Sequence, residues 1–524
     1  MDGVRARAVK WLDVLSRLYE KLRPAIIILL VLLLAAGSAV VFLQATAPHG
    51  IGVRSDSVAY LWGSENLAKG IGLGRLNGLG EFRPMTHWPP LYPLLLALPQ
   101  WFGLNSLSAA RLLGAISIGL MVLLVGMSIS RLTQGSPWYT GLGTLVLVTS
   151  YAMWDTSLYA MTEPLYMILG LLAFLFLDNY LSSNKRFWLY ASSAILGLSL
   201  LTRYAGGALI LAALLALFFR PGQVFRQKVK DSLILLLISV LPLALWTIRN
   251  ILLADTATNR YIEFSSIPAG EWLNLENLAV GWLLPVLKIS EVNSPRLLMI
   301  VLTALVLAWF TGRVKRPEQE KPTNLWIIYL LYSFSYVGYI LFSKLLFDKT
   351  IPLGEERIFL PFYATMLMLV VYGLFLLEKR ITNRPYLRIA LICIYVLVAT
   401  GFVRGYVQET ASYANLSSEK GLGLANESVT GLEIIPVIND LPSGPVIFTD
   451  DLEILYFLTG RHSFQINKVT PEEIQKIKEF MELRGIYLIL FGKNELGEQL
   501  KTGIPELEII YSGDDVIYSG AGLP

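Results

Sequence analysis

The sequence predicts an α-helical polytopic membrane protein with about eleven transmembrane helices and a small C-terminal α/β domain. Three observations predict it: the composition, the apolar runs and the distribution of Lys and Arg. Of 524 residues, 54% are hydrophobic and only 16% are charged, and the mean hydropathy is +0.56. A soluble domain carries about 25% charged residues. The composition therefore favours a chain that is largely in contact with lipid.

Long runs with few charges define the predicted spans. A run of about 18 apolar residues crosses a hydrocarbon core about 30 Å thick. The backbone must satisfy its own hydrogen bonds there, so each run is expected to be a helix. We expect spans near residues 24–46, 106–130, 137–154, 159–178, 186–201, 204–219, 231–253, 294–313, 324–343, 357–378 and 386–404. A charged amphipathic segment, 1–23, precedes the first run, which favours a retained anchor over a cleaved signal peptide.

Basic residues near the span ends predict the orientation. Lys and Arg are concentrated in the N-terminal tail and in alternate short loops, whereas the loop near 151–158 has none. The positive-inside rule then places the N-terminus in the cytoplasm. An odd number of spans places the C-terminus outside, in a multi-pass protein of the cell membrane. We expect a cytoplasmic segment 1–23, a transmembrane domain 24–404 and an extracytoplasmic domain 405–524. The predicted outer loops are 47–105 and 254–293, the second with an apolar stretch at 278–286 that can re-enter the bilayer.

The C-terminal tail has the patterns of a small α/β domain. Val446 to Phe448 and Tyr487 to Phe491 read as buried strands. Helical spacing is expected over 452–458 and 471–483, with a stop at Gly460. Residues 507–518 are expected to form a terminal hairpin.

Cysteine and histidine usage limits the chemistry. The only cysteine, Cys393, lies within an apolar run, and the chain has three histidines. No disulfide can form within one chain, and a metal site built from cysteine or histidine is not indicated. Nothing in the charge pattern indicates binding to nucleic acid.

The first outer loop, 47–105, contains most of the residues suited to binding and catalysis. Asp56 is expected to cap a helix over 57–69, and Pro89-Pro90 precedes a second helix over 91–102. Both helices have an apolar face that would lie along the membrane surface. The Gly-rich segment 70–80 is expected to be a flexible connection.

Several motifs resemble one enzyme superfamily. The run Asp56-Ser57-Val58-Ala59-Tyr60, followed by a Gly-rich stretch and Trp88-Pro89-Pro90-Leu91-Tyr92-Pro93, resembles the first outer loop of the GT-C glycosyltransferases. The most similar branch contains the protein mannosyltransferases and aminoarabinose lipid A transferases. Three further runs are similar to the same family and extend the resemblance over residues 24–400: Met161-Thr162-Glu163-Pro164-Leu165, Leu201-Thr202-Arg203-Tyr204 and Glu356-Arg357-Ile358-Phe359-Leu360-Pro361.

The resemblance implies a GT-C-like fold and transfer of a sugar from a polyprenyl-phosphate carrier. The acceptor would be an extracytoplasmic lipid, glycan or protein, and the anomeric carbon would be inverted. Asp56 matches the general base of the family; the alternative is that it only caps a helix. The protein mannosyltransferases have Asp-Glu where this chain has Asp56-Ser57. This departure argues against close kinship with that branch and against its protein acceptor.

Other residues in these motifs are candidates for the same site. Glu163 would orient the acceptor or position Asp56, or it would only pair with an Arg and hold helices together. Arg357 matches the family's carrier-phosphate ligand, but Glu356 beside it could neutralise it as an interfacial anchor. Asp155 is expected to be solvated.

The remaining candidates, together with Glu356, are proposed to contact substrate. Arg203 could bind phosphate, and Tyr204 could contact sugar or the interface. Arg83 and His87 could hold phosphate or acceptor, and Tyr60 shares the Asp56 motif.

No cofactor is required, although Asp56 and Glu163 could share a divalent metal. One competing function is a lipid or sugar transporter or flippase that forms no glycosidic bond. Such a transporter would be expected to show inverted repeats and broken helices near the midplane, and the sequence shows neither. A non-catalytic scaffold would leave the polar content of loop 47–105 unexplained.

Overall fold

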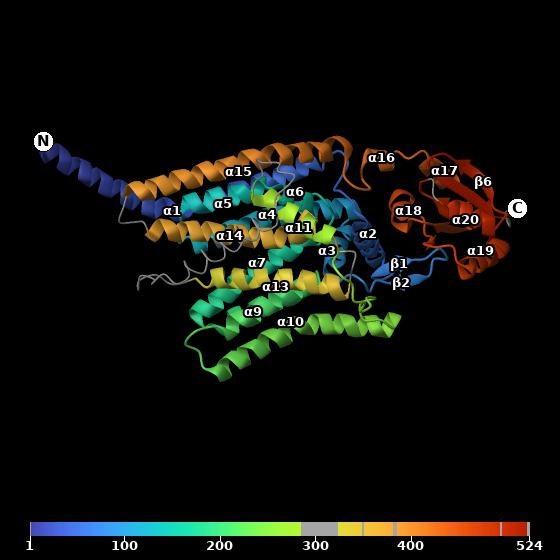
Figure 1. Cartoon of the computed structure of the whole chain (residues 1–524), viewed down its shortest axis with the longest axis horizontal. Helices are drawn as coiled ribbons and strands as arrows, with labels where there is room; N and C mark the ends of the chain where they lie inside the picture. The colour runs from blue at the N-terminus through green and yellow to red at the C-terminus, as the bar shows by residue number, and fades with distance from the viewer. Residues whose placement is uncertain (1, 284–322, 348–350, 381–384, 493–494, 521–524) are drawn as a thin grey trace.

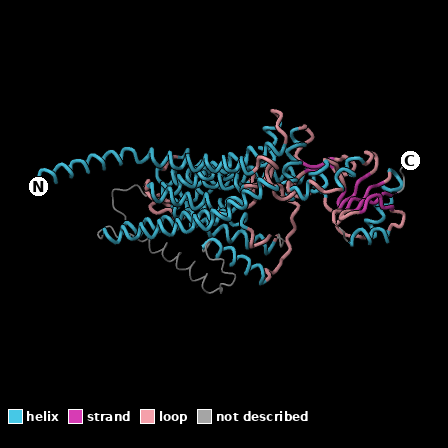
Figure 2. Tube along the Cα trace, turned by 90° about the horizontal axis from the view of Figure 1, so that it is seen from above, coloured by secondary structure: helices cyan, strands magenta, loops and turns pink. Residues whose placement is uncertain are grey.

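A computed structural model describes residues 2–283, 323–347, 351–380, 385–492 and 495–520. In this part of the chain a long helical bundle carries a small α/β domain at one end (Figure 1). The first helix starts at the opposite end, so the termini lie far apart. Figure 2, seen from above, shows the same separation between the helices and the sheet.

The bundle contains long and short helices. Its elements are α1 (Asp2–Ala45), α4 (Ser106–Leu132), α5 (Pro137–Thr149), α6 (Tyr151–Ser157), α7 (Glu163–Ser183), α8 (Arg186–Leu200), α9 (Gly206–Phe218), α10 (Phe225–Ala254), α11 (Ala269–Leu283), α13 (Leu325–Leu346), α14 (Glu356–Arg380) and α15 (Pro385–Lys420). Within the described ranges, seven helices are long and apolar enough to cross a membrane: α1, α4, α7, α10, α13, α14 and α15.

These helices confirm the predicted polytopic helical class, while the count of eleven spans is not confirmed. The predicted spans 137–154, 186–201 and 204–219 correspond to shorter helices, and the first of them is interrupted at Ser150, between α5 and α6. The predicted span 294–313 lies outside the described residues. The predicted re-entrant stretch is helical as far as Leu283, and Leu278 joins the core.

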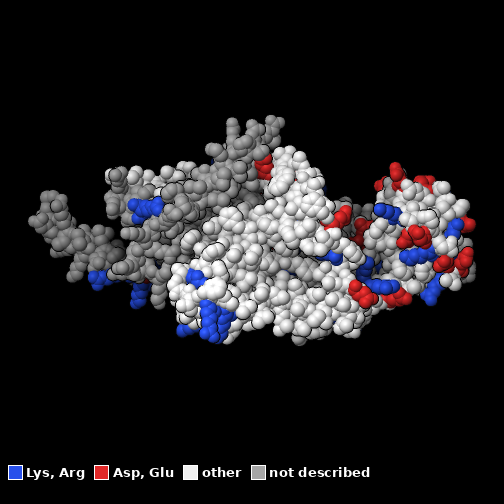
Figure 3. Space-filling view, turned by 60° about the horizontal axis from the view of Figure 1, so that its bottom comes forward, with Lys and Arg blue, Asp and Glu red and all other residues white. Residues whose placement is uncertain are grey.

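Charged and uncharged side chains occupy different parts of the bundle surface. On the face shown in Figure 3, Lys and Arg lie at the end remote from the sheet, charges of both signs lie toward the sheet-bearing end, and a broad, largely uncharged surface lies between them. Several of the predicted basic loops meet at the end remote from the sheet. Arg23 donates to the Gly135 carbonyl, Lys379 contacts Gln134, and Arg131 pairs with the buried Asp178. The uncharged middle has the character of a lipid-facing belt.

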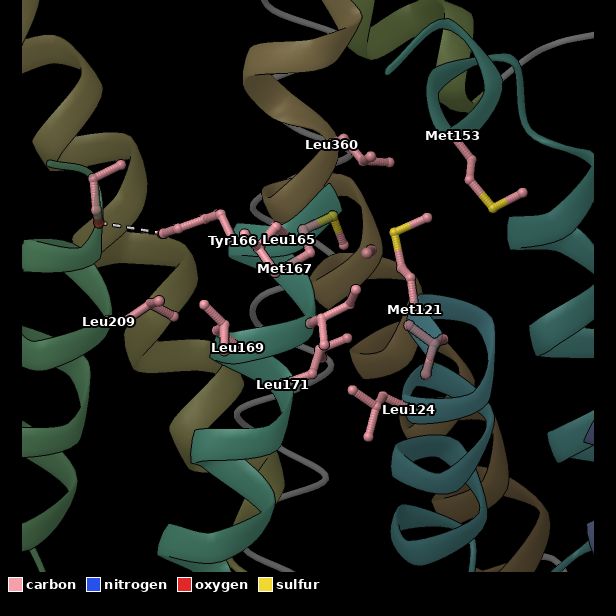
Figure 4. Packing of buried hydrophobic residues seen from close by; sticks show 14 of the residues in the cluster. Met121, Leu124, Met153, Leu165, Tyr166, Met167, Leu169, Leu171, Leu209 and Leu360 are labelled. Atoms are coloured by element: carbon pink, nitrogen blue, oxygen red, sulfur yellow. Dashed lines mark hydrogen bonds between the residues drawn. The ribbon is translucent and has the colours of Figure 1, made fainter. Parts of the chain in front are cut away.

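The core of the bundle is made by apolar side chains from several helices. Figure 4 shows Met121 and Leu124 of α4 facing Leu165 and Met167 of α7, with Leu360 of α14 nearby. A sparse polar network runs among them. Tyr166 donates to the Ala205 carbonyl at 3.2 Å, and its hydroxyl lies 2.9 Å from that of Tyr332. These two tyrosine hydroxyls are hydrogen-bonded, which avoids the cost of an unsatisfied polar group in an apolar interior.

Outer loop 47–105 folds into two helices and a hairpin. Its elements are α2 (Ser55–Ala68), β1 (Gly74–Leu76), β2 (Phe82–Pro84) and α3 (Leu91–Gln100). Two expectations were wrong. Asp56 is not the helix cap, because the Ser57 hydroxyl accepts from the Arg54 N–H at 3.0 Å and the helix starts at Ser55. The Gly-rich segment 70–80 is not a free connection, because β1 within it pairs antiparallel with β2, which follows it.

The predicted C-terminal α/β fold is present. Its elements are α16 (Glu427–Thr430), α17 (Ile434–Asp440), β3 (Val446–Thr449), α18 (Leu452–Thr459), β4 (Phe464–Gln465), α19 (Pro471–Arg484), β5 (Ile486–Leu490), α20 (Glu495–Gly503), β6 (Glu508–Ser512) and β7 (Val516–Gly520). The sheet order is β4-β3-β5-β7-β6, with parallel pairing of β3 to β4 and β5 and antiparallel pairing in the rest. Helices α19 and α20 supply the core on one face, and α17 and α18 on the other.

The C-terminal domain docks on α2 through aromatic rings. Trp62 stacks on Tyr456 with centroids 3.7 Å apart, and His462 stacks on Trp62 at 5.6 Å. The Tyr456 hydroxyl donates to Glu65 at 2.6 Å, and Ser106 donates to the same carboxylate. The helix that contains Asp56 therefore contacts the transmembrane bundle and the sheet-bearing domain at once.

Candidate active site

Four predicted residues form one continuous chain of charges at the end of the bundle that carries the α/β domain. Arg357 Nη1 lies 3.5 Å from Asp56 Oδ2 and 3.7 Å from Glu163 Oε1. Arg203 Nη1 lies 2.8 Å from the same Glu163 oxygen and donates to the Thr162 hydroxyl at 2.8 Å. Four motifs far apart in the sequence are thus brought together, at the N-terminal ends of α2, α7 and α14 and in the α8–α9 loop.

The N-terminal turns of two helices position the acidic residues of this chain of charges. Asp56 and Glu163 each lie in the first turn of a helix, α2 and α7. Carboxylates are favoured there because the helix macrodipole is positive at its N-terminus. Pro164 is accommodated in the same first turn, where its missing N–H has no intrahelical role.

The two carboxylates differ in exposure. The Glu163 side chain is 2% exposed, whereas the Asp56 side chain is 39% exposed. Glu163 is enclosed by the guanidinium groups of Arg203 and Arg357, so its charge is balanced inside the protein. Asp56 can be reached by a ligand, and it pairs with Arg357. Glu163 therefore suits a positioning role and Asp56 a role in direct contact with substrate.

An aromatic wall lies beside Asp56. Tyr60 contacts Tyr92 and Trp88 edge-on, with centroid separations of 5.3 and 6.1 Å. Burial raises the pKa of Tyr60 above its ordinary value, and the nearby Asp56 carboxylate raises it further. Tyr60 therefore stays protonated and can donate a hydrogen bond.

Cations and aromatic rings extend the chain of charges beyond Arg203. The guanidinium of Arg260 lies over the Tyr204 ring at 5.5 Å, and Arg260 Nη2 lies 3.3 Å from His87 Nε2. The half-buried Tyr339 of α13 lies near both Arg203 and Arg260. The residues of the extended chain of charges follow one another in the order Asp56, Arg357, Glu163, Arg203, Tyr204, Arg260 and His87. The exposed carboxylate lies at one end and the cations lie at the other.

A second cluster of ion pairs, around Arg54, adjoins the chain of charges. Arg54 Nη2 lies 3.2 Å from Asp155 Oδ1, which also accepts from the Tyr413 hydroxyl at 2.9 Å, and Arg54 Nη1 lies 3.7 Å from Glu355. The expectation that Asp155 is solvated was wrong, since its side chain is 13% exposed. Burial raises the pKa of Asp155, although Arg54 opposes the rise. Glu355 also pairs with Arg357, so it joins the two groups.

Two predicted substrate-binding residues, Arg83 and Glu356, lie apart from this chain of charges. Arg83 is 62% exposed and pairs with Glu81 at 3.2 Å beside the β1–β2 hairpin. Glu356 accepts a hydrogen bond from the Trp282 indole at 2.7 Å. Of the two adjacent carboxylates at the start of α14, Glu355 rather than Glu356 pairs with Arg357.

Sequence reasoning missed two useful cations. Arg260 reaches the site from the second outer loop, where no motif surrounds it. Arg249 donates to the carbonyls of Met85 and Leu73 and so fixes both sides of the hairpin. A lone Arg in an outer loop is the only signal that could have indicated Arg260.

A metal site was considered at Asp56 and Glu163. In the part of the chain that the structure describes, no group of three or more His, Cys, Asp or Glu side chains could hold a metal ion. Arg357 contacts both carboxylates instead.

Known structures share the fold at low sequence identity. No protein-family model and no curated protein matches this chain. The crystal structure of ArnT from Cupriavidus metallidurans bound to undecaprenyl phosphate is similar with a TM-score of 0.59 and 14% identity, over 94% of this chain and 98% of that chain. The same protein in the apo state has the same TM-score and identity, over 93% and 97%.

The mycobacterial arabinofuranosyltransferase AftD is similar with a TM-score of 0.50 and 13% identity, over 94% of this chain and 41% of that chain. These proteins are GT-C glycosyltransferases. The chain therefore has the GT-C fold, as its motifs predicted, and is a multi-pass membrane protein.

Proposed function

We propose that this protein transfers a sugar from a polyprenyl-phosphate carrier to a hydroxyl group of an extracytoplasmic acceptor. One observation carries the proposal. An exposed carboxylate, Asp56, heads a chain of buried and half-buried charges that ends in cations and aromatic rings. The arrangement occurs in a fold shared with ArnT, which has been seen with undecaprenyl phosphate bound.

In the proposed reaction, the base and the leaving phosphate lie at opposite ends of this chain of charges. Asp56 accepts the proton of the acceptor hydroxyl. The acceptor oxygen then forms a bond to the anomeric carbon as the bond from that carbon to the phosphate oxygen breaks. Inversion requires attack from the face opposite the leaving phosphate, so a base and a phosphate site on opposite sides of the sugar fit the reaction.

Cations suit the phosphate end. The lipid phosphate leaves with an additional negative charge on its oxygen, which preorganised positive groups stabilise. Arg203 and Arg260 supply such groups, with His87 beside Arg260. Arg357 lies between Asp56 and Glu163, so we propose that it holds the base and faces the phosphate as well.

The carrier lipid needs apolar surface near these cations. At the outer end of α10 and in the loop after it, Leu252, Tyr261, Ile262 and Phe264 are each at least three-quarters exposed. Arg260 precedes Tyr261 directly in the chain. A polyprenyl tail on this surface would bring its phosphate to the cationic end of the site.

Reconstitution tests this proposal. Purified protein in liposomes is given the polyprenyl-phosphate lipid fraction of its native membranes together with the native membrane glycolipids, and products are followed by mass spectrometry. A new glycosidic product with release of polyprenyl phosphate is expected. Movement of carrier lipid between leaflets without any glycosidic product would contradict the proposal and favour the transporter function.

A further inference from the structure

A short segment before the proposed base lies between two other segments of the chain. Gly52 forms a parallel β-bridge with Tyr159, and Val53 forms one with Gly423. Tyr159 lies just before α7, which starts with Glu163, and Gly423 lies just after α15. The three segments, 51–53, 158–160 and 422–424, therefore meet beside the site, and we call the last of them the strap.

The backbone hydrogen bonds of this junction are complete on both sides. The Gly52 N–H donates to the Leu158 carbonyl at 2.8 Å, and the Ala160 N–H donates back to Gly52 at 2.9 Å. On the other side, the Leu424 N–H donates to the Val53 carbonyl at 2.8 Å, and the Val53 N–H to Leu422 at 3.3 Å.

Side chains reinforce the strap. The Asn426 side-chain amide donates to the Gly421 carbonyl at 2.9 Å and closes the turn that contains Gly423. His49 Nε2 lies 3.0 Å from the Glu419 carbonyl oxygen. The chain leaving α15 is thus attached to the residues on both sides of Ile51.

Glycine is required for the close approach. Gly423 has φ +60°, and a Cβ placed there would meet the Val53 carbonyl oxygen well inside 3.0 Å. A Cβ at Gly52 would lie 2.8 Å from the Tyr159 ring and 2.9 Å from Leu422 Cβ. Any larger residue at either position must push the segments apart.

We propose that the strap is a positioning element of the active site, which sets Asp56 against Glu163 and Arg357. Only two residues separate Val53 from Asp56, and a stretch this short transmits a displacement with little slack. The bridge to Tyr159 joins the same segment to the entrance of the helix that starts at Glu163. The inference rests on the proposed function, because it concerns the placement of the proposed base.

The strap also connects the site to the C-terminal domain. The chain that follows it continues directly into α16 and α17, which belong to that domain. A rigid-body movement of the domain would therefore act on Asp56 through Gly423 as well as through the contact between α18 and α2.

The expected loss of transfer rate follows from the orientation of the catalytic group. Displacing a catalytic group by about 1 Å can lower a rate by about 100-fold, because the reacting atoms no longer meet in line. Gly423→Ala demands a shift of this order. We expect the kcat of transfer to fall by about 100-fold, while the donor KM and binding of undecaprenyl phosphate stay unchanged.

The matched control is Gly444→Ala in the same domain, where a Cβ would have nothing within 4 Å. Both variants are compared with wild type for kcat, donor KM, binding of undecaprenyl phosphate and hydrogen exchange over residues 51–60. Asn426→Ala is a milder variant, for use where Gly423→Ala does not yield folded protein. It is expected to lower kcat by about tenfold.

The outcomes separate this inference from the proposed function. A folded Gly423→Ala protein with wild-type kcat would overturn the positioning role, as would a loss confined to donor KM. Wild-type kcat in Asn426→Ala would overturn it where only that variant folds. An active Asp56→Asn protein would instead overturn the proposed function.

Discussion

Glu163 has the most demanding environment among the residues of the site. Its carboxylate is almost fully enclosed, with Arg203 and Arg357 both close to one oxygen. Removing one partner of a buried ion pair leaves the other charge uncompensated, which costs about 3 to 5 kcal/mol. The same charges hold Arg357 next to Asp56, so stability and activity are expected to depend on Glu163 together.

Glu163→Gln tests this dependence. We expect a loss of stability of about 3 kcal/mol and a fall in transfer rate, measured by thermal unfolding in detergent and by the reconstituted assay. Glu81→Gln is the control, because it breaks the exposed pair with Arg83, worth at most about 1 kcal/mol. Equal stability of the two variants would show that Glu163 is not part of a buried charge network.

Arg260 provides a test of the phosphate end. Arg260→Gln removes a positive charge from the cationic end but leaves the Asp56–Arg357 contact in place. We expect weaker binding of undecaprenyl phosphate and a higher donor KM, with a smaller effect on kcat at saturating donor. Unchanged binding of undecaprenyl phosphate would place the phosphate elsewhere. Arg83→Gln, which alters an exposed hairpin pair, serves as the comparison.

The sequence predicted individual site residues better than their partners. Asp56, Glu163, Arg203 and Arg357 lie in recognisable motifs at predicted span ends, and the structure brings them into one chain. The contact between Arg260 and His87 joins positions 173 residues apart. No local pattern encodes such a pairing, because it depends on how two outer loops pack. The sequence also indicated Glu356 rather than Glu355 as the neighbour that neutralises Arg357, because the local backbone geometry decides which of two adjacent carboxylates faces it.

At the scale of elements, the contact between α2 and α18 deserves a direct test because it links two parts of the molecule. His462 belongs to its ring stack. Burial lowers the pKa of His462 below its ordinary value of 6.5, and Lys69 lowers it further. The unfolded or undocked form therefore binds more protons than the docked form as the pH falls below about 6.5. The stabilisation is present above that pH and is lost as the pH falls toward the folded-state pKa.

We expect α18 to exchange its amide hydrogens faster at mildly acidic pH in wild type, after correction for intrinsic rates. In His462→Gln this additional pH dependence should be absent, since the residue no longer titrates. An identical pH dependence in both proteins would show that His462 does not control docking.

Other element-level expectations succeeded or failed for physical reasons. The strands and helices of the C-terminal domain have clear apolar periodicity and clear stops such as Gly460, which adopts a left-handed φ of 68°. The hairpin β1–β2 was missed because each strand has only three residues and is held by outside contacts. Arg249 supplies two of these from α10.

For the whole molecule, the predicted orientation places the basic loops inside and the sheet-bearing domain outside. We expect Glu472→Cys, in a Cys393→Ser background, to react with a membrane-impermeant maleimide in right-side-out vesicles. Arg226→Cys, in a basic loop at the other end of the bundle, should react only after permeabilisation. The reverse pattern would contradict the orientation and, with it, the extracytoplasmic acceptor.

The overall architecture was predictable because lipid imposes strong rules on length and charge. Seven helices in the described ranges meet the length and hydropathy of a span, and the uncharged belt lies where the apolar runs predict it (Figure 3). Short helices such as α9 were harder to classify, since packing against neighbours rather than length stabilises them. The approach of the C-terminal domain to loop 47–105 could not be predicted, because it joins surfaces with no shared pattern.

The most direct test of the account is the transfer rate of Asp56→Asn in reconstituted liposomes, with Asp514→Asn in the exposed C-terminal hairpin as control. General base catalysis contributes about 10²- to 10⁴-fold, so a loss of that size is predicted with binding of undecaprenyl phosphate retained. Asp514→Asn should transfer at the wild-type rate. A folded Asp56→Asn protein that transfers sugar as fast as wild type would contradict the assignment of Asp56 as the base.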